Sequence, residues 1–87
     1  MKLHLKYFAS LREALGAGGA IDFAPPGGGT ATAGALRAWL MAQSPEHARR
    51  LDPARAVRVA VDQVLADEDT PLADGAEVAF FPPVTGG

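Results

Sequence analysis

Residues 77–87 read Glu-Val-Ala-Phe-Phe-Pro-Pro-Val-Thr-Gly-Gly. The apolar run at their start predicts a short strand, and Pro82 and Pro83 end it because proline has no N–H to donate to a sheet. When extended, residues 82–87 reach about 20 Å beyond that strand. We therefore divide the chain into a folded domain, residues 1–81, and a flexible C-terminal Gly-Gly tail, residues 82–87.

The tail ends on two glycines and an α-carboxylate. Gly86 and Gly87 lack a Cβ, so they fit narrow channels in which a larger residue would clash. A carboxylate must be activated before it reacts, for example as an acyl-adenylate that a partner makes with ATP. The tail therefore predicts a carboxylate that is delivered to another protein. The alternative is a terminus without a role, since chain ends are often disordered and tolerant of change.

Alternation of apolar and polar residues predicts four further strands upstream of the tail. They are expected within residues 2–9, within residues 20–23, from Val57 to Val61, and briefly at Val64 and Leu65. The Asp74-Gly75 pair predicts a tight turn into the last strand. If one sheet face packs on a helix, its residues are Leu3, Leu5, Tyr7, Val57, Val59, Val61, Val78 and Phe80.

One long amphipathic helix is expected over residues 33–43, because Leu36, Trp39 and Leu40 recur at helical spacing. Thr30 or Thr32 is expected to cap it. Ser10 is expected to cap a short helical turn that Gly16 ends. Residues 45–54 read as a solvated helical turn and connection. One helix laid across a mixed sheet predicts an α+β fold of the β-grasp, ubiquitin-like type.

The opposite sheet face must then carry Phe8, Ala60, Ala79 and Phe81, and Leu65 joins them. Two phenylalanines that point toward water are unexplained in a monomer, and the alternative is that they are isolated surface aromatics without a role. Contiguous exposed apolar patches commonly mark protein interfaces. We therefore expect this face to bind a partner.

Composition excludes several classes of function. The 87 residues form one small domain, and no run approaches the roughly 18 apolar residues that a membrane span needs. Met1 and Lys2 lead directly into a strand, so no signal peptide is expected and a cytoplasmic location follows. A net charge of −2 argues against a nucleic-acid partner. The chain has no cysteine, so if it handles sulfur, only the terminal carboxyl group is left to hold it.

The charges are unevenly distributed along the chain. All eight Lys and Arg residues lie at or before Arg58, whereas residues 61–87 carry six acidic groups. One hypothesis is that an acidic flank beside the tail steers it toward a basic entrance on a partner. The alternative is that these acidic residues only form turns.

No metal site or resident cofactor is expected. His4 and His47 are lone histidines without neighbouring ligands at metal-binding spacing. The glycines at 27–29 lack the Lys-Ser/Thr pair of a phosphate-binding loop. Ser10 and Ser44, the only serines, lack the surroundings of a nucleophile. The chain therefore reads as a protein that is not an enzyme on its own.

Residues 74–87, Asp-Gly-Ala-Glu-Val-Ala-Phe-Phe-Pro-Pro-Val-Thr-Gly-Gly, closely resemble the C-terminus of the molybdopterin synthase small subunits, the ubiquitin-like sulfur carriers of the MoaD family. Residues 6–13 resemble that family's first strand and turn, and residues 32–43 its main helix. Ala76 and Asp62 depart from the usual aspartate and asparagine, which affects turn geometry more than function. The resemblance also implies that the first and last strands run parallel at the sheet centre.

The resemblance implies a non-catalytic sulfur-donor subunit of a two-subunit sulfurtransferase. An activating enzyme would adenylate Gly87 with ATP, and the resulting thiocarboxylate would donate sulfur to a pterin precursor inside a large catalytic subunit, in a heterotetramer. Gly86 would give clearance in the channel. The residues implied in partner binding are Phe8, Arg12, Leu65, Phe81, Pro82, Pro83, Val84 and Thr85. The alternatives are a ubiquitin-like modifier of lysines, or a sulfur carrier for thiamine or tRNA thiolation.

Overall fold

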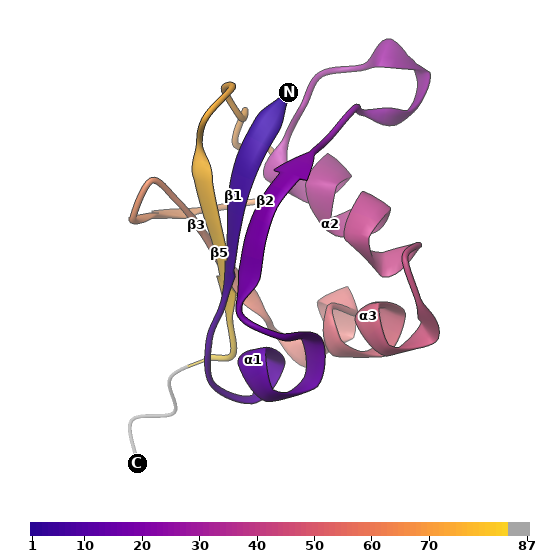
Figure 1. Cartoon of the computed structure of the whole chain (residues 1–87), viewed down its shortest axis with the longest axis vertical. Coiled ribbons are helices and arrows are strands. Elements are labelled where there is room, and N and C mark those ends of the chain that lie inside the picture. The colour runs from indigo at the N-terminus through magenta and orange to yellow at the C-terminus, as the bar shows by residue number, and fades with distance from the viewer. Residues whose placement is uncertain (84–87) are drawn as a thin grey trace.

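The computed structural model describes residues 1–83, which form a sheet with helices packed on one side of it (Figure 1). The elements are β1 (Lys2–Tyr7), α1 (Ala9–Leu15), β2 (Gly18–Asp22), α2 (Ala33–Met41), α3 (Pro45–Arg50), β3 (Arg58–Val61), β4 (Val64–Ala66) and β5 (Glu77–Phe81). Two 3₁₀ turns, Pro26–Gly28 and Pro53–Arg55, lie in the connections. The expectations for Val84, Thr85, Gly86 and Gly87 fall outside the described residues.

The five strands follow the order β2-β1-β5-β3-β4. β1 and β5 run parallel at the centre, where Leu5 lies opposite Val78 and Tyr7 opposite Phe80. The other three pairings are antiparallel. A mixed sheet with α2 across one face confirms the predicted β-grasp fold, including its parallel central pair.

The core lies between the sheet and the helices. Leu3, Leu5 and Tyr7 of β1 are buried, as the alternation predicted, and they pack in one cluster with Leu36 and Leu40 of α2. Val57, Val59, Val78 and Phe80 belong to the same cluster, whereas Val61 is only partly buried at its edge. Trp39 is also half-buried, with its ring edge-on to Phe23 at 5.6 Å between centroids. It covers the margin of the core and does not fill its centre.

Two local expectations are corrected. α1 begins at Ala9 with Phe8 at its N-cap position and no side-chain cap, so Ser10 lies inside the helix. The backbone N–H groups of Leu11 and Arg12 donate to the carbonyl of Phe8, which leaves the Ser10 hydroxyl without a capping role. Leu51, in the segment expected to be solvated, is fully buried. It follows α3 directly, whose packing on α1 and α2 carries the chain back to the core.

The first turn of α2 has all four of its N–H groups satisfied. Thr32 caps the helix, with its Oγ1 accepting from the Ala35 N–H at 3.1 Å and its carbonyl accepting from Leu36. The N–H groups of Ala33 and Gly34 donate to backbone carbonyls of the connection between β4 and β5, at 2.9 Å each. A Cβ at Gly34 would lie 3.0 Å from the carbonyl oxygen of Glu68, so this close approach requires glycine.

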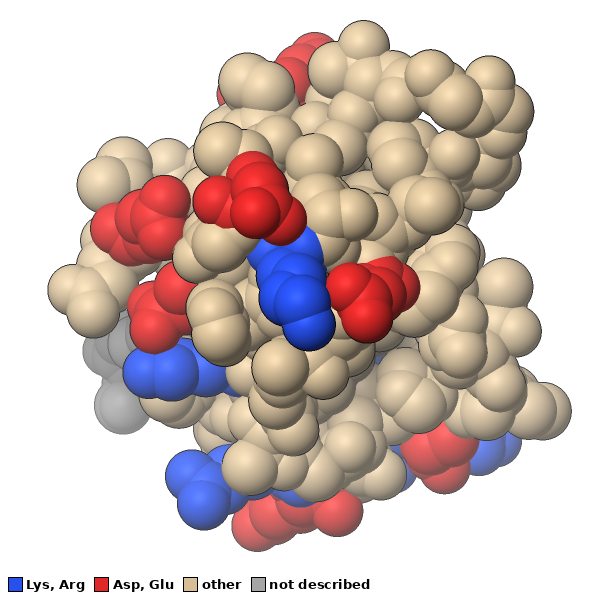
Figure 2. Space-filling view, turned by 45° about the horizontal axis from the view of Figure 1, so that its top comes forward, with Lys and Arg blue, Asp and Glu red and all other residues tan. Residues whose placement is uncertain are grey.

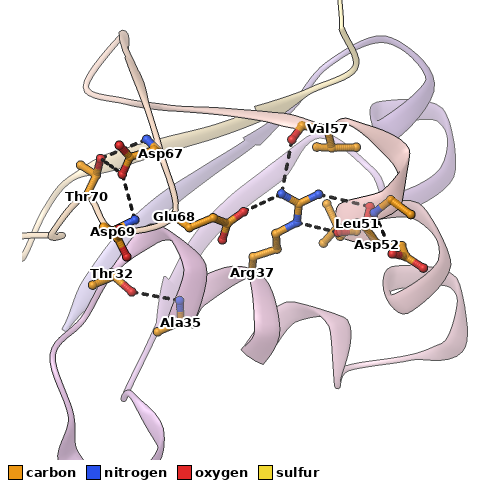
Figure 3. A network of polar contacts seen from close by, with 11 residues as sticks. Thr32, Ala35, Arg37, Leu51, Asp52, Val57, Asp67, Glu68, Asp69 and Thr70 are labelled. Atoms are coloured by element: carbon orange, nitrogen blue, oxygen red, sulfur yellow. Dashed lines mark hydrogen bonds and ion pairs between the residues drawn. The ribbon is translucent and has the colours of Figure 1, made fainter.

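Arg37 connects α2 to three other segments of the chain (Figure 3). Its Nε donates to the carbonyl of Leu51 at 2.6 Å, and its two terminal nitrogens donate to the carbonyls of Val57 and Asp52 at 3.3 Å. One of them also pairs with the Glu68 carboxylate at 2.8 Å. Arg37 is only 5% exposed, and sequence patterning did not predict that a charged residue lies so deep. Its guanidinium fixes a connection that has no strand or long helix of its own.

We expect Arg37→Ala to lower the free energy of unfolding by about 3 kcal/mol or more, because it leaves buried carbonyls without donors. Urea unfolding followed by Trp39 fluorescence measures this change. Glu68→Gln should cost less, because the Glu68 side chain is 56% exposed and returns to water. Arg49→Ala, which removes a surface ion pair to Glu46, is the matched control. Equal stability of the Arg37 and Arg49 variants would contradict this role.

Tyr7 carries a buried hydroxyl with no hydrogen-bond partner among the described residues. The residue is 4% exposed, and its ring lies beside that of Phe80 at 6.2 Å between centroids. Burial raises the pKa of the Tyr7 hydroxyl from 10.0 to about 12, since the core disfavours the phenolate. This side chain therefore packs as a phenylalanine would, with an added polar atom that costs stability.

We expect Tyr7→Phe to keep or raise stability at pH 7, because it removes an unsatisfied hydroxyl. As pH rises from 10.0 to about 12, the unfolded wild type ionises at Tyr7 and the folded protein does not, so wild-type stability falls. The Tyr7→Phe variant lacks this contribution, and its advantage over wild type should widen across that range. Denaturant unfolding at several pH values measures the gap, which is the difference in free energy of unfolding between the variant and wild type. A gap that stays constant above pH 10.0 would show that burial does not perturb this hydroxyl.

Candidate functional site

The sheet face turned away from α2, called the outer face below, carries a row of residues across four strands that begins with a lysine and is otherwise apolar. Lys6 of β1 lies opposite Ala79 of β5, which lies opposite Ala60 of β3, which lies opposite Leu65 of β4. Ala79 is buried by its neighbours but is not part of the core cluster, as expected for a small side chain on the other face. Leu65 is 61% exposed. The side chains at the centre of the row are therefore small, and the leucine at its β4 end is exposed to solvent.

A second row lies two residues further along β5, at the end of that strand. Phe81 lies opposite Arg58 of β3. On the other side, Phe8 follows β1 directly, and its N–H donates to the carbonyl of Phe80 at 3.2 Å. Phe8 is 45% exposed and Phe81 is half-buried, and neither belongs to the core cluster. Both phenylalanines thus lie outside the core, as strand alternation predicted. They lie at the ends of two neighbouring strands, β1 and β5.

The root of the tail adjoins this second row. Pro82 is half-buried and Pro83 is exposed, and both follow Phe81 at the end of a central strand. Arg12 is exposed in the last turn of α1, the helix that begins directly after Phe8. The structure thus gathers Phe8, Phe81 and the prolines at one end of the sheet. Leu65 and Arg12 lie to either side, on β4 and α1.

Arg58 and Lys6 are members of the outer face that were not among the predicted site residues. The signal was available, because Lys6 shares the parity of Phe8 and Arg58 shares the parity of Ala60. Lys6 forms an ion pair with Glu77 on the neighbouring strand, with 2.9 Å between Nζ and Oε1. Arg58 is exposed beside Phe81. The face is therefore apolar at its centre and basic where the tail begins.

Two of the acidic residues that were considered as a flank for the tail lie away from the tail root. Asp74 accepts from the Lys2 N–H at 2.6 Å and Asp62 accepts from the Glu77 N–H at 3.0 Å, so both lie at the start of β5. The tail leaves from its other end. β3 runs antiparallel to β5, and this places Arg58 next to Phe81, whereas Asp62, which directly follows β3, lies at the far end. The alternative, turn-forming acidic residues, describes Asp62 and Asp74 correctly.

Further acidic side chains are engaged in turns or ion pairs elsewhere. Asp67 accepts from the Asp69 N–H at 2.9 Å within its own turn, and Glu68 pairs with Arg37. Hydrogen bonds from Arg50 and Arg49 lower the pKa of the Glu46 carboxyl on α3. On the face shown in Figure 2, acidic and basic side chains adjoin one another. That face therefore offers no broad area of one sign for a polyanion.

Residues 1–83 contain no group of three His, Cys, Asp or Glu side chains placed to hold a metal ion. In the same range, no helix is both long and apolar enough to cross a membrane. A shallow, open hollow is lined by Asp62, Gln63 and Glu77. The Asp62 N–H donates to the carbonyl of Glu77, and the Glu77 N–H donates to the Asp62 carboxylate, so these groups are already paired with each other. The outer face and the tail root thus remain the candidate site.

Known proteins resemble this chain over nearly its whole length. A profile described as the ThiS family matches residues 5–87. The molybdopterin synthase sulfur carrier subunit of Escherichia coli (strain K12) is 44% identical over 84 residues, which cover 93% of this chain and 94% of that protein. The protein of the same name from Haemophilus influenzae is 35% identical over 85 residues, covering 98% and 99%.

Among solved structures, small archaeal modifier protein 1 of H. volcanii superposes with a TM-score of 0.76 at 27% identity, and the match covers 95% of this chain and 98% of that one. The fold and its connections are therefore shared with a protein named as a modifier, whereas the sequence is closer to proteins named as sulfur carriers. The chain belongs to the ThiS family and is a relative of the sulfur carrier subunits of molybdopterin synthase.

Proposed function

We propose that this chain is the sulfur-carrier subunit of a molybdopterin synthase and that Gly87 carries the sulfur as a C-terminal thiocarboxylate. The observation that carries the proposal is the position of the tail root, Pro82 and Pro83. These prolines continue the central strand β5 beside an apolar outer face, whose side chains lie outside the core cluster that the helices cover among residues 1–83. The identity to two carrier subunits over nearly full length supports the same reading.

The chemistry follows from the properties of a carboxylate. Attack of a Gly87 oxygen on the α-phosphate of ATP, in an activating enzyme, gives an acyl-adenylate and releases pyrophosphate. A sulfide-level donor then attacks the acyl carbon, and AMP leaves with the bonding electron pair. The thiocarboxylate is nucleophilic at sulfur, so it can attack a carbon of a pterin precursor, from which an oxygen leaving group departs with the bonding electron pair. Hydrolysis of the resulting thioester-type bond leaves sulfur on the precursor and restores the carboxylate.

The partners of this chain supply catalysis in this proposal. The chain itself binds no cofactor, and ATP is used by the activating enzyme. The tail enters a large catalytic subunit, in a heterotetrameric complex, where exclusion of water limits loss of the thiocarboxylate. Gly86 provides clearance, residues 82–85 span the distance from the sheet, and Phe8, Phe81 and Leu65 bind the large subunit. Dithiolene formation for the molybdenum cofactor is the outcome.

A second function is favoured by one observation, the structural match to a protein named small archaeal modifier protein 1. A modifier would share activation of Gly87 and then transfer it to a lysine amine. A carrier for thiamine or tRNA thiolation would share the tail chemistry, because the partner sets the destination of the sulfur. The fourteen residues that close the chain favour the molybdopterin pathway over these.

The proposal is tested by mass spectrometry of the full chain after incubation with an activating enzyme, ATP and a sulfide donor. We expect Gly87 to exchange one oxygen for sulfur, and the loaded chain to convert a pterin precursor when the large subunit is added. Deleting Gly86-Gly87, or adding one alanine after Gly87, should abolish both steps. Neither change should affect urea unfolding, because both lie outside the folded domain.

Two results would contradict this function. Full sulfur transfer by the deletion variant would show that the terminal carboxyl group is not the carrier. An isopeptide adduct between Gly87 and lysines, with no exchange of oxygen for sulfur, would instead assign the chain as a modifier.

A further inference from the structure

We infer that the large subunit presents a carboxylate to Arg58, and that this ion pair fixes the orientation in which the outer face binds. The inference rests on the proposed function, since it specifies the chemistry of the partner surface that receives the tail. It assigns to Arg58 a positioning role beside the apolar contact.

The first argument is the location of Arg58. It is the first residue of β3 and lies directly opposite Phe81, the last residue of β5. Residues opposite one another in an antiparallel pair have Cβ atoms about 5 Å apart. A partner surface that covers the Phe81 ring therefore borders the Arg58 side chain. Apolar docking at this end of the sheet brings Arg58 to the interface.

The second argument is charge compensation. The ion pairs among residues 1–83 involve Lys6, Arg37, Arg49 and Arg50, and none of them involves Arg58. Lys6, the other cation of the outer face, is already paired with Glu77. Covering a guanidinium without an acceptor is costly, whereas a carboxylate matches its planar donors in a bidentate pair. The partner must therefore supply an acidic group at this point.

The third argument is the polarity of the face along β5. Asp62, Asp74 and Glu77 lie at the start of the strand, and Arg58 lies at its end. A partner carboxylate is attracted by Arg58 when the partner binds with that carboxylate at the end of β5. In the reversed orientation it would face the carboxylates at the start of β5, and like charges brought together at an interface repel each other. Arg58 thus selects the orientation in which the tail root faces the partner's channel.

The test measures the affinity of the purified large subunit for the full chain carrying Arg58→Glu or Arg58→Gln. We expect Arg58→Glu to raise Kd by about tenfold or more at low salt, with a smaller rise for Arg58→Gln. The difference from wild type should narrow at about 0.5 M NaCl, where charge interactions are screened. Arg49→Glu, the same charge change on α3 in the helical layer, should bind as wild type does. Urea unfolding of each variant confirms that it is folded.

Wild-type affinity of Arg58→Glu at low salt would overturn the inference. An equal loss for Arg49→Glu would also overturn it, because the effect would then come from net charge. Sulfur loading of Gly87, measured on the same variants, separates this inference from the proposed function. A variant that loads sulfur and binds like wild type refutes only the role of Arg58. Absence of loading in the wild type, or of any binding to the large subunit, refutes the proposed function and with it the inference.

Discussion

The parallel pairing of β1 with β5 is the constraint on which the rest of the structure depends. It sets Leu5 against Val78 and Tyr7 against Phe80 on the core side, and Lys6 against Ala79 on the other side. A slip of one residue would move each of these side chains to the opposite face. β5 is both the central strand and the last strand of the chain. The same pairing therefore places the tail root at the end of the middle strand of the sheet.

The two faces of the sheet are satisfied in different ways. On the helical side, the connections are held by specific hydrogen bonds, with Arg37 binding the carbonyls of three residues and the β4–β5 connection capping α2. On the outer side, no helix of the described chain covers the alanines and phenylalanines. A small domain buries less of its surface than a large one, and here the uncovered part is apolar and adjoins the tail. A partner that covers this surface would bury its apolar side chains and receive the tail at the same time.

Strand alternation predicted much of the fold and of the candidate site, because side-chain parity is a local property of the sequence. It separated Phe80 from Phe81 and placed Phe8 and Leu65 on the outer face, and the resemblance added the parallel centre. Arg37 and Leu51 were missed because their burial depends on segments that meet only in three dimensions. The position of Asp62 was not predicted for a related reason. One hypothesis placed the acidic residues beside the tail from chain order, whereas antiparallel pairing brings Arg58 to the tail root and sends Asp62 away from it.

The central claim is that adjacent residues of β5 serve two different faces, one for the core and one for the partner. The most direct measurement is the affinity of the large subunit for Phe81→Ala and Phe80→Leu under conditions in which both variants are folded. The account predicts that Phe81→Ala unfolds near the wild-type urea concentration but binds about tenfold or more weakly, as expected for an aromatic anchor. Phe80→Leu should lose stability and keep its affinity. Wild-type affinity of Phe81→Ala would contradict the account.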